Sequence, residues 1–412
     1  MQEPLTDEVI EQAVRKMPPE YDALDGERMA EALKGRREKL PEAARDFYEL
    51  LAGEVNAHAT DQAEVAVIER GDDDSLTVTI SRKAPDGEPT GEPIYRRRFT
   101  ADETNEVRVF LHGGDDRAVV RGRRGSIRLR VIAGEGRDEL DDSLTGGSFF
   151  YDASGETNVK KGPDTKLDTR AYDRPVPVAH VPWLPPRDWG SQTLTVPYSG
   201  WSQDYGFFLG TGVDYRRFGF RKNPYSSRHI IRGGYAFGAK AARFDYRGEW
   251  RRENSGAYTS LRAFASGLEI LNYFGPGNET TDELDEEFYQ VGQTQYLLAP
   301  AYTFPLMGSL DLAIAPVVRY ATTDEETDDL VGALQPYGSG KFAQLGGALR
   351  LELDTRDSEN APTQGFHFNL TGAVYGPWWD VDETFGQLFG DVATYLTARG
   401  RFETTLALRA GG

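Results

Sequence analysis

The stretch ARFDYRGEWR, residues 242–251, alternates small or aromatic side chains with charged ones. The charged positions share one face of an extended chain and are Arg243, Asp245, Arg247, Glu249 and Arg251. Successive side chains of a β-strand point to opposite faces, so this segment is predicted to be a strand with one apolar and one charged face. A single strand of this kind also fits a soluble sandwich, and the fold class therefore depends on whether the pattern recurs.

The same alternation recurs through the second half of the chain. It predicts eleven strands, over residues 192–199, 205–220, 226–238, 240–252, 256–270, 287–303, 309–321, 341–354, 364–377, 384–399 and 401–409. Most are longer than the roughly five or six residues that are usual in soluble sheets, and they match a tilted membrane crossing. Residues 192–412 are therefore predicted to form an antiparallel transmembrane β-barrel of the bacterial outer-membrane type.

The predicted register gives this barrel two distinct faces. Phe244, Tyr246, Trp250 and Leu312 are expected to face lipid, because they alternate with the charged positions. The lumen-facing charges are predicted to be Arg243, Asp245, Arg247, Glu249, Arg251 and Arg350. If the barrel were a passive pore, these charges would set its ion selectivity.

The connections between the predicted strands differ in length. The two longest, residues 275–287 and 322–340, follow the fifth and seventh strands, whereas those after the even-numbered strands are short. Long extracellular loops and short periplasmic turns are typical of outer-membrane barrels, so residues 1–191 are expected in the periplasm. Both long loops are acidic, which suits divalent cations at a lipopolysaccharide surface, but solvated, self-repelling loops are the simpler interpretation.

Three segments precede the predicted barrel. Residues 1–60 are predicted to be helical: Thr6 can cap a first helix that Pro18 and Pro19 end, a second helix covers 26–37, and a third begins at Pro41. The amphipathic pattern of this segment favours a small scaffold that packs on a neighbour. Residues 61–152 show short alternating runs separated by Gly and Asp and are predicted to be a soluble β-rich domain. Residues 153–191 are predicted to be a Pro-rich linker.

Composition excludes several classes of protein. No run of eighteen apolar residues exists, which rules out a helical membrane span, and without cysteine there can be no disulfide or thiolate site. The net charge of −19 argues against nucleic acid as a partner. The N-terminus has no apolar export signal, and the eleventh predicted strand is still running at the last residue. We therefore expect a fragment of a longer protein, whose barrel is truncated and does not close by itself.

The segment LELDTRDSENAPTQGFHFNLTG, residues 351–372, carries Asp-x-Arg-Asp followed by Pro-Thr-x-Gly. It resembles the turn between two barrel strands of the bacterial surface antigens, the family that includes BamA/TamA-like assembly factors. FFLGTGVDYRRFGFRKNPY (207–225) and FGPGNET (274–280) are similar to members with an upstream calcineurin-like metallophosphoesterase domain. The residues that match the family turn are Asp354, Arg356, Asp357, Pro362, Thr363 and Gly365.

The resemblance implies a factor in the assembly or translocation of outer-membrane proteins. Its partners would be outer-membrane lipid, lipopolysaccharide and nascent outer-membrane proteins, and a weakly closed seam would offer backbone groups to an incoming strand. A passive surface antigen or pore, or a membrane anchor for a missing phosphoesterase, is the alternative. The phosphoesterase ligand signatures are absent and five histidines cannot supply a binuclear site, so we expect no catalytic residue, metal or cofactor in this chain.

Two motifs have a plain structural interpretation that we prefer. In the family turn, Pro fixes φ, Gly supplies a positive φ, and Asp and Arg tie the strand ends together, so a tight turn explains these residues without any chemistry. The segments GGDDRAVV (113–120) and GEGRDELDD (134–142) resemble half-turns of a calcium β-roll. A roll needs several stacked repeats, and ordinary Gly/Asp turns are therefore preferred here.

Overall fold

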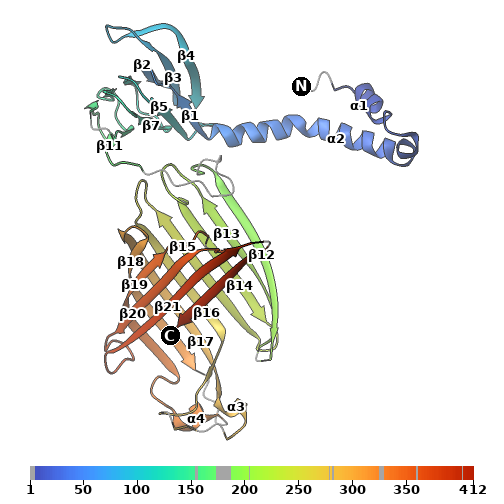
Figure 1. Ribbon diagram of the computed structural model, residues 1–412, viewed down its shortest axis with the longest axis vertical. Coiled ribbons are helices and arrows are strands. Elements are labelled where there is room, and N and C mark those ends of the chain that lie inside the picture. Colours follow the sequence, from blue (N-terminus) through green and yellow to red (C-terminus); the bar gives the residue numbers. More distant parts are fainter. Residues whose placement is uncertain are drawn as a thin grey trace. The chain divides into compact units, whose positions relative to one another are not determined.

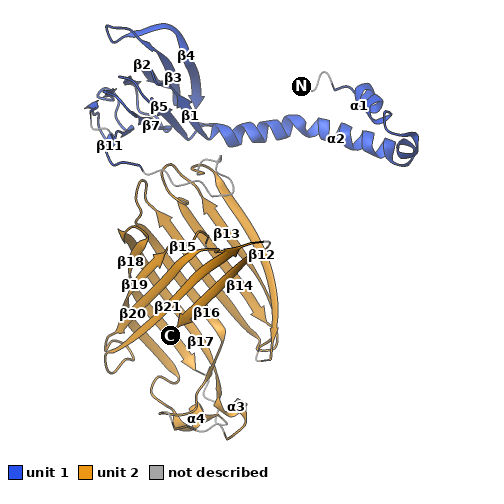
Figure 2. Ribbon diagram, viewed as in Figure 1, with its two compact units in different colours: residues 1–173 blue, residues 174–412 orange. Residues whose placement is uncertain are grey.

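The computed structural model describes residues 5–153, 156–172, 187–203, 205–277, 279–280, 283–323, 329–358, 361–400 and 402–412. The protein is mainly β, with two helices near the start of the chain (Figure 1). It divides into two compact units, unit 1 over Met1–Asp173 and unit 2 over Arg174–Gly412 (Figure 2). None of the helices within the described ranges combines the length and apolarity of a membrane span.

Unit 1 begins with the helices α1 (Asp7–Val14) and α2 (Pro19–Ala52). As predicted, the Thr6 side chain caps α1 by accepting the Val9 N–H at 3.3 Å. α2 starts at Pro19, earlier than the second helix that was predicted. The prediction of separate helices over 26–37 and from Pro41 was wrong, because α2 continues through Pro41 without a break. One missing N–H donor in an exposed part of a 34-residue helix does not interrupt it.

The rest of unit 1 is built from two β-sheets between which the chain passes repeatedly. The first sheet is parallel throughout and has the order β1-β5-β7-β9-β11. In the second, the order is β10-β8-β6-β2-β3-β4, and only the β2–β3 and β3–β4 pairs are antiparallel. The bounds are β1 Glu54–His58, β2 Glu64–Arg70, β3 Ser75–Lys83, β4 Pro89–Thr100, β5 Glu106–Phe110, β6 Arg117–Gly122, β7 Arg128–Ile132, β8 Glu139–Asp141, β9 Phe149–Tyr151, β10 Asn158–Lys160 and β11 Lys166–Asp168.

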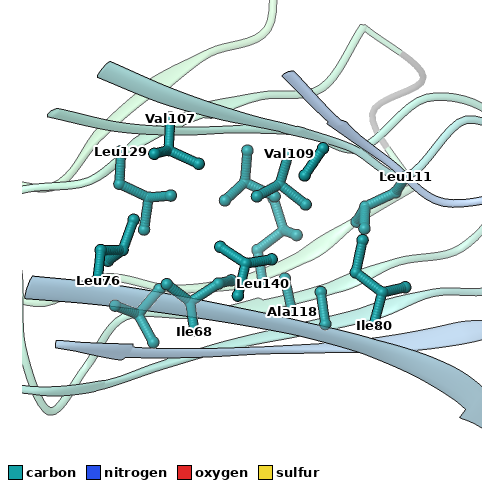
Figure 3. Close-up of a cluster of buried hydrophobic side chains, with 14 of the residues drawn as sticks. Ile68, Leu76, Ile80, Val107, Val109, Leu111, Ala118, Leu129 and Leu140 are labelled. Carbon is teal, nitrogen blue, oxygen red and sulfur yellow. The ribbon is translucent and has the colours of Figure 1, made fainter. Parts of the chain in front are cut away.

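The core of unit 1 lies between these two sheets (Figure 3). Val107, Val109 and Leu129 come from the first sheet, while Ile68 and Leu140 come from the second, and all five are fully buried. Complete burial of an aliphatic side chain of this size contributes about 1.5–3 kcal/mol. The two sheets of unit 1 are therefore held together by the apolar layer between them.

Three strands of unit 1 lie outside residues 61–152, the segment that was predicted to be β-rich. β1 falls inside the segment expected to be helical, and β10 and β11 fall inside the expected linker, so both boundaries were wrong. Strands of three to five residues hold too few side chains to show a period of two, and here they are fixed by parallel pairing with β5, β8 and β9. Most of the Pro-rich stretch, residues 173–186, lies outside the described residues.

The two Gly/Asp segments of unit 1 are stacked turns of successive coils, not separate ordinary turns. Gly113 and Glu135 form a parallel bridge, and Gly114 and Gly136 both have positive φ values, 115° and 122°. A Cβ at Gly136 would lie 1.9 Å from the Gly114 carbonyl oxygen, so the close stacking requires glycine. The interpretation as ordinary Gly/Asp turns did not include this stacking, because two imperfect copies of a motif do not show a clear repeat in the sequence.

Unit 2 is a single antiparallel sheet of eleven strands in sequence order, which confirms the predicted fold class and strand number. Their lengths range from 9 to 18 residues. In Figure 1 the sheet is strongly curved. The strands are β12 Ser191–Ser202, β13 Gly206–Arg217, β14 Ser227–Ala236, β15 Ala241–Arg251, β16 Tyr258–Asn272, β17 Gln290–Met307, β18 Leu310–Thr323, β19 Lys341–Asp354, β20 Gly365–Tyr375, β21 Phe385–Arg399 and β22 Glu403–Gly411.

The edges and connections of this sheet follow the prediction in part. β12 and β22 form the two edges and are not paired with each other within the described residues, as expected for an open sheet. The two long connections follow β16 and β18 and carry the short helices α3 (Glu286–Tyr289) and α4 (Leu330–Leu334). The connections 218–226 and 355–364, at the other end, are longer than the tight turns expected there.

Candidate functional site

The convex face of the curved sheet is covered by apolar side chains. One cross-strand row runs from Ile314 on β18 through Leu349 and Gly372 to Leu388 on β21. The side chains of Ile314, Leu349 and Leu388 are 48%, 54% and 74% exposed. Phe244 and Leu209 are exposed in the same way, on β15 and β13. A continuous apolar surface of this extent marks a face that contacts another molecule or a membrane.

The opposite face is concave and charged. Arg319 on β18 donates to the Gln387 Oε1 on β21 at 3.3 Å, although these strands are not neighbours, and only the concave side permits such a contact. The cross-strand register places all six charges predicted to face the lumen on the same side as Arg319. These six are Arg243, Asp245, Arg247, Glu249, Arg251 and Arg350.

Most of these charges are neutralised by a neighbour at short range. Arg247 Nε lies 3.3 Å from Asp245 Oδ1, and Arg251 Nη2 lies 3.4 Å from Glu249 Oε2, each pair being two residues apart on β15. Arg350 Nε lies 3.8 Å from a Glu352 oxygen. The concave face is therefore lined by mixed charges, which suits contact with water.

A second ion cluster, which the sequence predicted incompletely, lies on β13 and β14. The Asp214 carboxylate accepts from Arg216 at 2.8 Å and from Arg228 at 2.7 Å. In the loop between these strands, the Tyr225 hydroxyl donates to Glu249 Oε2 at 2.5 Å. The alternation places Asp214 and Arg216 on one face, but Arg228 was missed because the residues around it do not alternate regularly.

The family turn connects β19 to β20 and forms two separate hydrogen-bonded groups. Arg356 donates to both carboxylate oxygens of Asp354, at 2.9 and 2.6 Å, and this pair closes the end of β19. Asp357 accepts the backbone N–H groups of Thr363, at 2.9 Å, and of Gln364, at 3.3 Å. These bonds hold the pKa of the Asp357 carboxyl below its ordinary value, the Thr363 hydroxyl being the main cause.

Gly365 completes this turn, and its neighbours anchor it. Its φ is 111°, and a Cβ there would lie 2.4 Å from the Thr355 carbonyl oxygen. The Thr397 hydroxyl on β21 donates to the Thr363 carbonyl oxygen at 2.5 Å, while Pro362 precedes Thr363 in the loop. Every group described in this turn satisfies a backbone or strand-end partner, which is the arrangement of a structural turn.

The described residues contain no group of three or more His, Cys, Asp or Glu side chains placed to hold a metal ion. Of the acidic residues in the long loops, Asp329 caps α4 by accepting the Gly332 N–H at 2.5 Å. Residues 281–282 and 324–328 lie outside the described residues, and so does the cation-binding hypothesis for the acidic side chains at these positions. The two stacked Gly/Asp turns of unit 1 also hold a buried acidic pair, Asp116 and Asp138.

Comparison with protein-family models found no match, and comparison with curated protein sequences found none. Among solved structures, the chain is similar to BamA from Haemophilus ducreyi lacking POTRA domains 1–3, at 12% sequence identity and a TM-score of 0.35. The likeness covers 54% of this chain and 40% of that one, so the chain spans less than half of that structure. A likeness this low supports no inference about function, and membership of the surface-antigen family stays a prediction.

Proposed function

We propose that unit 2 is embedded in the bacterial outer membrane as part of a β-barrel. The observation that carries the proposal is the contrast between its two faces, apolar on the convex side and charged on the concave side. Antiparallel strands of 9 to 18 residues satisfy their backbone groups by pairing with neighbours, as hydrocarbon requires, and are long enough to cross when tilted. In water, each large convex side chain would forgo about 1.5–3 kcal/mol of burial.

A matched pair of substitutions on β18 tests this proposal. Ile314→Arg places a charge on the convex face, and Ala315→Arg places the same charge on the adjacent concave position. We expect Ile314→Arg to lower the stability of the chain folded into liposomes by about 2–4 kcal/mol, and Ala315→Arg to lower it far less. Urea titration of the liposome-bound fraction measures both, and equal effects would contradict the proposal.

We further propose that the protein assists the insertion of outer-membrane proteins by offering β12 to an incoming strand. β12 has β13 as its one neighbour within the described residues, so its other edge has free backbone groups. The placement of polar and apolar side chains on β12 is the reverse of that on the other strands. The register puts Thr195 and Ser199 on the convex face and Leu194 and Val196 on the concave face. Pro197 removes one donor from this strand, which weakens any permanent pairing there.

Behind β12 the concave face holds a cavity of about 660 Å³. Its lining includes the apolar side chains of Leu194, Val196 and Ile230 and the charged side chains of Asp245 and Arg247. A strand added at the β12 edge would place alternate side chains against this cavity, so the site can take the inward residues of an amphipathic strand.

The chain has no native cysteine, which makes a disulfide test of strand addition direct. Thr195→Cys on β12 is expected to form a disulfide, in liposomes with an added thiol oxidant, with a cysteine-bearing peptide of alternating apolar and polar residues. Leu298→Cys on the interior strand β17 is the control and is not expected to react. Equal reaction at both positions would contradict strand addition.

A passive pore is the second candidate, and the charged concave face favours it. An open conductance in planar bilayers that changes ion selectivity on Arg350→Glu would support the pore. A chain that shows no open conductance, and whose Thr195→Cys variant forms a disulfide with the added peptide, would support the assembly function.

A further inference from the structure

A second cavity, of about 710 Å³, lies on the concave face near the loop that follows α4. Its wall combines residues from β15 to β19 and from β21, and Tyr337 of the loop after α4 also contributes. The register places Phe264, Leu297, Arg319 and Gln344 in one row across four strands. The volume falls in the range of about 300–1,000 Å³ that is typical of small-molecule sites.

The charges that line this cavity are predominantly positive, although the whole chain carries −19. Arg243, Arg262 and Arg319 face it, and Glu269 is the one acidic residue of the lining. Glu269 forms an ion pair with Arg243: Arg243 Nη1 lies 3.8 Å from Glu269 Oε1. A concave surface with an excess of one charge concentrates ligands of the opposite charge.

Of these three arginines, Arg262 is the one whose presence is not explained by a contribution to the stability of the sheet. It lies directly opposite Arg247 in the β15–β16 register, and directly opposed like charges destabilise an antiparallel pair. Arg247 is paired with Asp245, whereas Arg262 forms no ion pair within the part of the chain that the structure describes. The guanidinium of Arg262 is therefore available to an anion from outside the protein.

The uncharged part of the lining consists of amides and aromatic rings. Glutamines 293 and 295 stand on β17, Gln344 on β19 and Gln387 on β21, and Phe264, Phe342 and Phe385 contribute aromatic rings to the lining. Arg319 is held in place, because it donates to Gln387 Oε1 and its guanidinium carbon lies 5.4 Å from the ring centroid of Tyr375. Tyr375 in turn stacks on Phe385 at 5.0 Å.

We infer that this cavity binds an anionic saccharide, a sugar that carries a phosphate or a carboxylate. The planar guanidinium groups match either anion, glutamine amides both donate to and accept from hydroxyl groups, and aromatic faces cover the apolar side of a sugar ring. A bare inorganic anion would contact the arginines alone, whereas a sugar can also contact the amides and rings of the lining. The inference rests on the proposed function, because the ligand reaches the cavity only if the concave face is open to water.

Calorimetric titration of the full chain in detergent tests the inference with four probes: glucose 6-phosphate, glucuronate, glucose and inorganic phosphate. We expect glucose 6-phosphate and glucuronate to bind saturably, at least tenfold more tightly than either glucose or phosphate. Arg262→Gln and Arg319→Gln are expected to weaken this binding at least tenfold. Arg409→Gln, which removes a concave arginine on the distant edge strand β22, is expected to leave it unchanged.

Two outcomes would overturn the inference: equal affinity for phosphate and glucose 6-phosphate, or unchanged affinity in Arg262→Gln. Retained binding in Arg262→Lys shows that loss in Arg262→Gln comes from the charge and not from misfolding. Displacement of the probe by lipopolysaccharide would support a membrane-borne source of the saccharide, and no displacement a free one. Flotation of the chain with liposomes is measured separately: a chain that floats but binds no probe overturns this inference alone, and one that does not float overturns the proposed function.

Discussion

Removing the buried carboxylate of Asp116 should abolish much of the pH dependence of unit 1. Its Oδ1 accepts the Glu64 N–H at 2.7 Å, while its Oδ2 is buried with no hydrogen-bond partner in the described part of the chain. Burial, with added repulsion from Asp138 and Glu64, raises the pKa of Asp116 to about 7 from the ordinary 3.8. Between pH 3.8 and about pH 7, the Asp116 carboxyl is therefore protonated in the folded chain but ionised in the unfolded chain. The free energy of unfolding therefore falls as pH rises through this window.

The size of this effect follows from the width of the window. One pKa unit corresponds to about 1.4 kcal/mol, so from pH 5 to pH 8 the wild type should lose about 3 kcal/mol that Asp116→Asn does not lose. The asparagine keeps the oxygen that accepts from Glu64 but has no charge. Asp115→Asn is the matched control, because Asp115 is exposed and borders the same turn.

Urea equilibration at pH 5 and pH 8, followed by a short deuterium pulse at one common pH, measures the unfolding of unit 1 in the full chain. Mass spectrometry of peptides from β5 and β6 reports this unit separately from unit 2. If Asp116→Asn showed the same loss of stability between pH 5 and pH 8 as the wild type, Asp116 would not titrate in this range and the reasoning would be refuted.

Two further predictions concern the turn between β19 and β20. Gly365→Ala should lower the stability of unit 2 by about 1–3 kcal/mol in urea titration, because its φ of 111° and the nearby Thr355 carbonyl leave no room for a Cβ. Gly347→Ala, with open space around it, should change little, and equal effects would show that backbone strain is not the cause. The hydrogen bonds that lower the pKa of Asp357 stabilise the turn above its ordinary pKa and are lost as pH falls through the lowered value. Exchange protection of the Thr363 amide should therefore decrease in acid for the wild type but not for Asp357→Asn; the same decrease in both would contradict this role.

The sheet of unit 2 could be predicted because its signal extends over many residues. Strands such as β18 and β19 alternate for 14 residues each, so a wrong register would have placed charges among the apolar positions. Unit 1 gave weaker signals. The five residues of β1 and the three of β11 become strands only through parallel partners that lie far away in the sequence.

The two cavities of the concave face could not be predicted from sequence patterns. Arg262, Arg319 and Gln387 meet across strands that are separated by long stretches of chain, and alternation along one strand does not reveal which residues of another strand lie beside it. That Asp357 lies in a tight turn could be predicted from the sequence, because Asp, Pro and Gly each favour turn conformations. Its hydrogen bonds to Thr363 and Gln364 required the structure.

The central claim is that the convex face of unit 2 contacts lipid, and one measurement tests it directly. Because the chain has no native cysteine, a nitroxide label can be attached at each position from 366 to 371 on β20 in turn, in liposomes. We expect accessibility to dissolved oxygen to peak at Phe366, Phe368 and Leu370, and accessibility to a water-soluble nickel chelate to peak at the positions between them. Oxygen accessibility that peaks at the positions between these three residues, or that does not alternate along β20, would contradict contact of the convex face with lipid.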